Sequence, residues 1–320
     1  MEATYDGDAV RAGRAGREQF YDARGYGRPV DGDVHLAPVE AAHLLFQGDL
    51  DAVVDGEGDR LGFRGFLASA AVSEVAFFVY RDLRDRGFYL SPAYRVRAVG
   101  ERADVPAATL SGLAGRGEGT GVLAVVDEES ELTYFAVEAP TLTGSSYRDV
   151  PEVTGELVAD RVLVPDPPET LHGRAFYGQR LDEDGTVQLS LVEAASLAGR
   201  GGLGLAGRAD AERALLDRGR EVEGERFDRR LQVYDALRTA GIVPKTGYKF
   251  GADFRTYAHV ESVADLGHSE RLVRVLPADH TFAPRDLALD VRLAHGVRKE
   301  MTVALVDGGV EWLSVTRLTP

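Results

Sequence analysis

The sequence contains no cysteine, one tryptophan and only three lysines among its 320 residues. Without cysteine the chain can form neither a disulfide bond nor a thiolate metal site, which is usual for a cytoplasmic protein. No apolar run approaches the roughly 20 residues of a membrane-spanning helix, so we expect no membrane association. The first residues, MEATYDGDAV, lack the basic-then-apolar order of a signal peptide. These absences predict a location in the cytoplasm.

Lysine is scarce although the chain is highly charged, with 37 lysines and arginines against 52 acidic residues and a net charge of −15. Phosphate binding requires local positive charge, so this balance argues against a nucleic-acid partner. The alternative is a surface adapted to concentrated salt, where the Debye length is about 3 Å at 1 M and net charge says little about partners. The near absence of lysine favours this halophilic interpretation.

The chain repeats itself with a nearly constant offset. YGRPVDGDVHLAPVEAAHLL resembles YGQRLDEDGTVQLSLVEAASLA, and VYRDLRDRGFYLSPAY resembles VYDALRTAGIVPKTGY. The matched tyrosines Tyr26 and Tyr177 are 151 residues apart, and Tyr80 and Tyr234 are 154 apart. Each half ends in an alternating segment typical of a hairpin, VLAVVDEESELTYFAV and TVALVDGGVEWLSVTR. The sequence therefore predicts a tandem duplication.

The second repeat is longer, because Asp127 and Asp307 at the equivalent hairpin turns are 180 residues apart. The interval that contains the extra residues holds Tyr257, His268, His280, His295 and Lys299. The first repeat has instead AATLSGLAGRGEGTG at 107–121, which predicts a loop. We expect a degenerate, non-catalytic repeat over 1–150 and a catalytic repeat over 151–320, with its catalytic subdomain from about residue 230 onward.

Periodicity predicts an α+β fold. VAFFVYRDLRDRG and RRLQVYDALRTAG are expected to be helices ending at Gly87 and Gly241, and RLVRVLP a strand ending at Pro277. An amphipathic helix is expected over 285–301. Its apolar face would hold Leu289, Leu293, Ala294, Val297 and Met301, and its other face Arg292, His295 and Lys299. Each repeat would then have a helical or mixed N-terminal subdomain and an α/β C-terminal subdomain with a mixed sheet.

Common catalytic motifs are absent: there is no P-loop, no GxSxG and no HExxH, and the scattered histidines do not suggest a metal site. The second repeat instead contains KTGYKFGADFRTY, HSERLVRVLP and VRLAHGVRKEM, in that order. These motifs closely resemble the catalytic region of archaeal tRNA-splicing endonucleases. The resemblance covers the whole chain, because one architecture of that family is a fused two-repeat chain that forms homodimers. With the lysine-poor composition, it suggests a halophilic archaeon.

The resemblance implies excision of introns from precursor tRNA at bulge–helix–bulge motifs, without metal or another cofactor. Cleavage would leave a 2′,3′-cyclic phosphate and a 5′-hydroxyl. By position, the family's catalytic triad falls on Tyr257, His268 and Lys299. Tyr257 would be the general base toward the ribose 2′-hydroxyl, His268 the general acid, and Lys299 the charge that stabilises the transition state.

The resemblance also suggests how RNA and a second subunit are bound. Arg292 and Arg317 would hold a bulged base between their guanidinium planes, the alternative being surface salt bridges. An acidic turn of the first repeat, with Asp127, Glu128 and Glu129, would dock into the opposing catalytic unit of the homodimer. The alternative is a solvated hairpin turn.

Two other functions stay open. One is a non-catalytic RNA-binding or assembly subunit of the same fold, although such a chain should have lost the triad. The other is a nuclease that acts on other RNAs with the same bulged motif, such as precursor rRNA, and one enzyme could act on both.

Overall fold

The structure is a computed structural model that describes residues 1–69, 71–88, 95–115, 120–147, 149, 152–181 and 185–320. Its internal contacts divide the chain into two compact units. The first comprises Met1–Ala103, Gly117–Ala136 and Leu318–Pro320, and the second Asp104–Arg116 and Val137–Arg317. All five predicted catalytic and RNA-binding residues lie in the second unit. The repeat boundary near residue 150 stays a prediction about the sequence.

The first unit begins with a sheet in the strand order β3-β4-β2-β1-β5-β6. These strands are β1 (Glu2–Tyr5), β2 (Val10–Ala12), β3 (Arg28–Val30), β4 (Asp33–Leu36), β5 (Ala52–Val54) and β6 (Arg60–Leu61). The helices around them are α1 (Arg14–Gly16), the π-helix η1 (Arg17–Asp22), α2 (Pro38–Gln47), α3 (Phe63–Ala68) and α4 (Glu74–Asp85). The buried core lies between this sheet and α2, which contacts α3 and α4.

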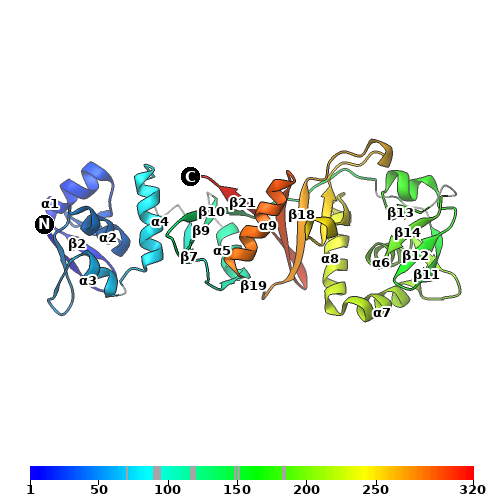
Figure 1. Ribbon diagram of the computed structural model, residues 1–320, viewed down its shortest axis with the longest axis horizontal. Helices are drawn as coiled ribbons and strands as arrows, with labels where there is room; N and C mark the ends of the chain where they lie inside the picture. The colour runs from blue at the N-terminus through cyan, green and yellow to red at the C-terminus, as the bar shows by residue number, and fades with distance from the viewer. Residues whose placement is uncertain (70, 89–94, 116–119, 148, 150–151, 182–184) are drawn as a thin grey trace. The chain divides into compact units, whose positions relative to one another are not determined.

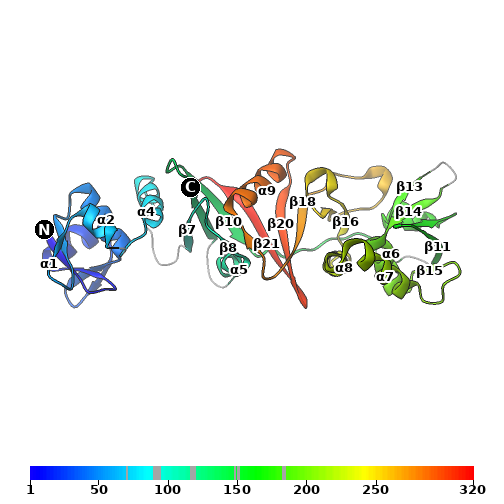
Figure 2. The same ribbon diagram turned by 60° about the horizontal axis from the view of Figure 1, so that its bottom comes forward.

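The second unit contains a sheet ordered β13-β14-β12-β11-β15, which matches the order β3-β4-β2-β1-β5 of the first and has no counterpart of β6 among the described residues. Its elements are β11 (Val153–Val158), β12 (Arg161–Val164), the π-helix η2 (Thr170–Arg174), β13 (Gln179–Arg180), β14 (Val187–Ser190), α6 (Leu191–Gly199) and β15 (Leu203–Leu205). As β1 pairs antiparallel to β2 and parallel to β5, so β11 pairs antiparallel to β12 and parallel to β15. Helices α7 (Ala211–Glu223) and α8 (Glu225–Thr239) contact α6 and each other (Figure 2).

The last part of the second unit has the strand order β16-β17-β18-β20-β21. Its elements are β16 (Val243–Thr246), η3 (Tyr248–Phe250), β17 (Phe254–Tyr257), η4 (Val263–Asp265), β18 (Arg271–Pro277), β19 (Thr281–Phe282), α9 (Pro284–Gly296), β20 (Glu300–Asp307) and β21 (Gly309–Leu318). Strands β18 and β20 are parallel, and α9, which connects β19 to β20, packs against β20 (Figure 1). The unit also includes β8 (Val105–Pro106), paired with β19, and α5 (Ala107–Ala114).

In the first unit β7 (Val96–Gly100) pairs parallel to β9 (Gly121–Val126), which neighbours β10 (Leu132–Glu138). This is the same pairing as that of β18, β20 and β21. Among its described residues, the first unit has no counterpart of β16 and β17. Tyr257 therefore lies on a strand, β17, that belongs to the additional part of the second half. Lys299, by contrast, precedes β20, which corresponds to β9 of the first unit.

Several expectations about single elements are confirmed. Helices α4 and α8 end just before Gly87 and Gly241, which have the left-handed φ values of 89° and 79° that glycine adopts without strain. Strand β18 covers 271–277 as predicted, and the alternating segments form the strands β9, β10, β20 and β21. The mixed α and β content is also as expected.

The segment predicted as a loop at 107–121 was wrong in its first half. Residues Ala107–Ala114 form the helix α5, which buries Leu110 and Leu113, and residues 116–119 lie outside the described part of the chain. Alanine and leucine are strong helix formers, and their propensity outweighs the glycine content on which the loop prediction was based.

The prediction of a helix over 285–301 was wrong in its end and its buried face. Helix α9 ends at Gly296, so Met301 and Lys299 lie outside it. Leu289, Leu293 and Val297 are exposed, and the buried stripe is Pro284, Leu287, Val291 and Ala294. Two apolar stripes compete on this helix, and contact with the sheet decides between them. In the part of the chain that the structure describes, no helix is long and apolar enough to cross a membrane.

Candidate active site

Strand pairing brings the three predicted catalytic residues to one edge of the sheet. Strand β17 runs antiparallel to β18, with Thr256 opposite Arg271, and β20 runs parallel to β18, with Arg271 opposite Glu300. The end of β17 and the beginnings of β18 and β20 therefore lie side by side. Tyr257 is the last residue of β17, His268 lies three residues before β18, and Lys299 directly precedes β20.

Lys299 is held in place by the turn that follows α9. Its backbone N–H donates to the carbonyl of Ala294 at 2.9 Å, and Arg298 before it has a φ of 56°. Its Nζ donates to the carbonyl of Ser269 at 2.5 Å, next to His268 in the chain. Burial lowers the pKa of Lys299, and the charge of Arg255 lowers it further, while Glu270 opposes both. The side chain is half-buried, so its charge is only partly hydrated.

The ring of Tyr257 is buried in an apolar cluster. Its exposed fraction is 5%, and it packs with Val243 and Val260. The ring of Phe176 contacts it edge to face, with 5.7 Å between the ring centroids. The guanidinium of Arg255 lies 5.7 Å from the centroid of the Tyr257 ring. The ring is therefore held between apolar contacts and a cation.

His268 is exposed, in the connection between η4 and β18, and Ser269 after it is buried. An exposed imidazole can exchange its proton with solvent and can reach a bound molecule. In the described residues no cluster of histidine, aspartate or glutamate is arranged to hold a metal ion.

Two further charged residues lie at this edge and were missed by the motif comparison. Glu270 Oε2 accepts the N–H of Ala258 at 2.9 Å, and the backbone of Glu270 bonds to Thr256 and Glu300 at 3.0 Å each. Glu270 thus ties the three strands together. Arg255 Nε is buried without a hydrogen-bond partner in the described part of the chain. Strand alternation could have indicated Arg255, two residues before Tyr257, but no local signal marks Glu270.

The two predicted RNA-binding arginines are both exposed. Arg317 lies near the end of β21, which pairs with β20 so that Val315 is opposite Met301. Continuing this antiparallel register by two residues places Arg317 opposite Lys299, at the same sheet edge. Arg292 lies on α9, one turn before its end.

The acidic turn of the first unit connects β9 and β10. Asp127 Oδ1 accepts the backbone N–H groups of Glu129 and Glu131 at 2.9 Å each, so Asp127 shapes the turn. Glu128 forms an ion pair with Arg102 at 2.5 Å. Glu129 is exposed and makes its contribution to the turn through its backbone.

Two family models match parts of the chain. The family model of the catalytic C-terminal domain of tRNA intron endonucleases matches residues 227–312. The model of their N-terminal domain matches twice, at residues 1–67 and at 153–214. These matches cover more than half of the chain. The chain belongs to the tRNA intron endonuclease family.

Its relatives in this family match it from end to end. The chain is 56% identical to a tRNA-splicing endonuclease of Haloarcula marismortui and 53% identical to one of Natronomonas pharaonis, over 100% of each chain. It is 35% identical to the tRNA-splicing endonuclease of Methanosarcina mazei over 99% of each. The first two organisms are halophilic archaea, which agrees with the lysine-poor composition. The residues matched by the C-terminal model, 227–312, include β17, β18, α9 and β20, and with them Tyr257, His268 and Lys299.

Proposed function

We propose that the chain is a tRNA-splicing endonuclease that excises introns from precursor tRNA at bulge–helix–bulge motifs. The observation that carries the proposal is the convergence of Tyr257, His268 and Lys299 at one sheet edge, in a chain of this family. A subunit that only bound RNA or assembled others would have no need of a base, an acid and a cation at the same edge.

In the proposed reaction Tyr257 acts in its phenolate form and accepts the proton of the ribose 2′-hydroxyl, which leaves it as the phenol. The 2′-oxygen then attacks the adjacent phosphorus, and the bond from phosphorus to the 5′-oxygen of the next nucleotide breaks. His268 donates a proton to that departing oxygen. The products are a 2′,3′-cyclic phosphate and a 5′-hydroxyl, so protons and bonds balance without a further reactant.

Lys299 supplies the positive charge that the transition state requires. Negative charge builds up on the phosphoryl oxygens as the 2′-oxygen adds, and a compact ammonium group that is already in place stabilises it. The contact of Lys299 with the carbonyl of Ser269 supports this role, because it fixes the ammonium beside the connection that carries His268.

Recognition of the substrate would use Arg292 and Arg317, which hold a bulged base between their guanidinium planes. The matching topology of the two halves supports a tandem duplication in which the first copy has, among its described residues, no counterpart of β16 and β17. Two chains would form a homodimer, with the acidic turn of Asp127, Glu128 and Glu129 docked into the opposing catalytic unit.

The test is cleavage of a bulge–helix–bulge RNA by the purified protein in EDTA and high salt. We expect cuts in both bulges with cyclic-phosphate ends, and no cuts in a fully paired control RNA. Lys299→Ala should reduce the cleavage rate by about 100-fold or more. Binding without cleavage would favour the non-catalytic subunit, and equal rates for Lys299→Ala and the unsubstituted protein would overturn the mechanism.

A further inference from the structure

Phe176 has a backbone conformation that favours glycine, with a φ of 53°. The repeat alignment that matches Tyr26 with Tyr177 places Gly25 at the equivalent position, and Gly25 has a φ of 65°. Both residues donate their N–H to the carbonyl four residues earlier, at 2.9 Å for Gly25 and 3.1 Å for Phe176. The two halves therefore share one backbone turn, with glycine in the first and phenylalanine in the second.

A left-handed φ is unstrained for glycine and strained for a residue with a side chain. Non-glycine residues keep such a conformation where the surrounding structure enforces it, and these positions concentrate at functional sites. In the half that carries the triad, the position equivalent to Gly25 is occupied by Phe176, whose backbone is strained. We therefore asked which contacts of the Phe176 side chain explain its presence at this position.

The ring of Phe176 packs on Tyr257. It is 5% exposed, and its plane is inclined at 63° to the ring of Tyr257, with 5.7 Å between centroids. Val243 pairs with Tyr257 across β16 and β17 and belongs to the same apolar cluster. Phe176 and Val243 thus both pack against the ring of Tyr257.

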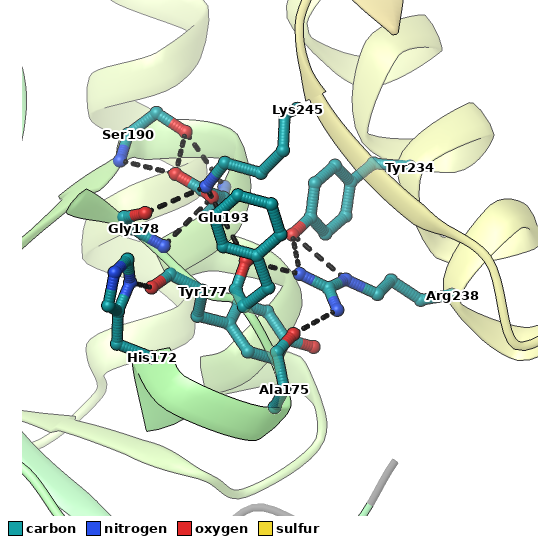
Figure 3. A network of polar contacts seen from close by, with 10 residues as sticks. His172, Ala175, Tyr177, Gly178, Ser190, Glu193, Tyr234, Arg238 and Lys245 are labelled. Atoms are coloured by element: carbon teal, nitrogen blue, oxygen red, sulfur yellow. Dashed lines mark hydrogen bonds and ion pairs between the residues drawn. The ribbon is translucent and has the colours of Figure 1, made fainter. Parts of the chain in front are cut away.

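A buried lysine holds the segment that carries Phe176. Lys245 Nζ donates to the carbonyl of Gly178 at 2.9 Å (Figure 3). It also donates to the carbonyl of Phe176 at 3.5 Å. It also forms an ion pair with Glu193 at 2.6 Å, and it lies 4.8 Å from the centroid of the Phe176 ring. Lys245 belongs to β16, two residues after Val243, so it links this segment to the strand that positions Tyr257.

A second buried cation holds the same segment from the α8 side. Arg238 donates to the carbonyl of Ala175 at 2.7 Å and stacks over the ring of Tyr177, 3.8 Å from its centroid (Figure 3). The hydroxyl of Tyr234 accepts two further bonds from this guanidinium, at 2.9 Å and 3.0 Å. The residues on both sides of Phe176 are therefore fixed by charged donors.

We propose that Phe176 is a positioning residue for Tyr257. Its strained backbone, clamped by Lys245 and Arg238, presses its ring against the ring of Tyr257 and sets the direction of the phenolic oxygen toward the ribose 2′-hydroxyl. The first half has no such tyrosine among its described residues and keeps glycine at the equivalent turn. This inference rests on the proposed function.

The test compares Phe176→Gly, Phe176→Leu and the conservative Phe176→Tyr in single-turnover cleavage of a bulge–helix–bulge RNA, with RNA affinity measured separately. A displacement of about 1 Å at a reacting group costs about 100-fold in rate, so we expect a loss of that order for Phe176→Gly at nearly unchanged RNA affinity. Phe176→Leu should lose less, and Phe176→Tyr should retain most of the rate. Phe227→Leu, a buried aromatic residue of another apolar cluster, is the control for general destabilisation.

A double substitution separates positioning from stability. When Tyr257→Phe has already removed the phenolic oxygen, adding Phe176→Leu should change the residual rate little, because the two changes act through one group. A purely structural role would lower the rate by the same factor in both backgrounds and would overturn the proposal. Unchanged cleavage by Phe176→Leu would also overturn the proposal. If Phe176→Gly does not fold, the rate of Phe176→Leu decides the question.

The same series distinguishes failure of this inference from failure of the proposed function. Absence of cleavage by the unsubstituted protein contradicts the function itself, and full activity of Tyr257→Phe contradicts the role of Tyr257. Slow cleavage by Tyr257→Phe together with normal cleavage by both Phe176→Leu and Phe176→Gly contradicts only the positioning role.

Discussion

Lys299 is one of three lysines in a chain whose other basic residues are arginines, and its surroundings explain why the amine is retained. The Nζ points to the carbonyl of Ser269, in a half-buried position beside Arg255 and Phe250. A planar guanidinium has a different shape and spreads its charge over three nitrogens. It cannot reproduce a compact charge at this point without moving its neighbours.

Lys299→Arg should therefore impair cleavage more than binding. The positive charge remains, so RNA affinity should change little, whereas the rate should fall by about 100-fold because the transition-state contact is lost. Single-turnover rates and RNA titrations in high salt measure the two effects. The control is Lys249→Arg, since Lys249 belongs to the same family motifs but is exposed. Equal losses of rate and affinity would contradict this interpretation.

The pKa of Lys299 can be measured directly, because only three lysines contribute signals in a chain labelled with ¹³C at lysine Cε. Burial and the charge of Arg255 lower the pKa of Lys299, so its signal should titrate below the ordinary lysine value. Arg255→Gln removes the positive charge of Arg255, so the pKa of Lys299 should rise. A titration of Lys299 that does not respond to Arg255→Gln would exclude the coupling.

At the scale of elements, a buried ion pair attaches β16 to α6. Lys245 and Glu193 form this pair, and Glu193 also accepts the N–H groups of Gly178 and Ser190 at 3.0 Å each. Burial raises the pKa of Glu193, but Lys245 and these donors outweigh it and bring the pKa to about 2. Burial lowers the pKa of Lys245, and the charge of Glu193 opposes that shift. The first half uses Glu40 in the same way toward Gly27.

Breaking one side of this pair should cost more than removing both. Lys245→Met leaves a buried carboxylate without its cation and should destabilise the protein by about 3–5 kcal/mol. Lys245→Met combined with Glu193→Gln should cost less, because no charge is left unpaired. Denaturant unfolding of the two variants at pH 7 measures the difference. Equal destabilisation would show that the cost comes from lost packing instead.

The same pair should contribute to acid sensitivity. The pKa of Glu193 in the folded protein is about 2 and its ordinary value is 4.5, so its stabilisation is present above pH 4.5 and is lost as the pH falls toward 2. The double variant should lack this part of the pH dependence. Thermal unfolding between pH 5 and 2.5 tests this. Identical acid profiles of the double variant and the unsubstituted protein would contradict the low pKa of Glu193.

At the scale of the whole molecule, the proposed homodimer depends on the acidic turn between β9 and β10. Asp127 shapes that turn and Glu128 pairs with Arg102, so Glu129 is the residue whose carboxylate is best placed to contact another chain. Glu129→Lys reverses this charge while leaving the backbone bonds of the turn intact. We expect the dimer to weaken, measured by light scattering in high salt across a range of protein concentrations.

The β5–β6 hairpin offers a matched control. There Asp55 Oδ1 accepts the N–H groups of Glu57 and Asp59 at 3.0 Å and 2.9 Å, the same arrangement as in the acidic turn. Glu57→Lys makes the same charge change in the same kind of turn. If Glu129→Lys, like Glu57→Lys, leaves the measured mass at that of a dimer, the acidic turn has no part in dimerisation.

The sequence by itself determined the elements whose signals are local. Gly87 and Gly241 end their helices because a left-handed φ is unstrained for glycine, and the alternation of apolar residues in 302–317 specifies a hairpin. The offset between Tyr26 and Tyr177 revealed the repeated topology, since similar sequences adopt similar folds. The three catalytic candidates were identified from sequence motifs, which can be recognised without knowledge of the tertiary structure. A location in the cytoplasm stays a prediction.

The tertiary structure decided what depends on contacts between distant segments. Which stripe of α9 is buried depends on the sheet below it, and the pattern of leucines alone does not specify that choice. Tyr257, His268 and Lys299 lie toward the same edge of the sheet because β17, β18 and β20 pair in one register, and this pairing joins segments that are far apart in sequence. The strain at Phe176 became visible in its backbone φ, since a phenylalanine looks in the sequence like any other apolar residue.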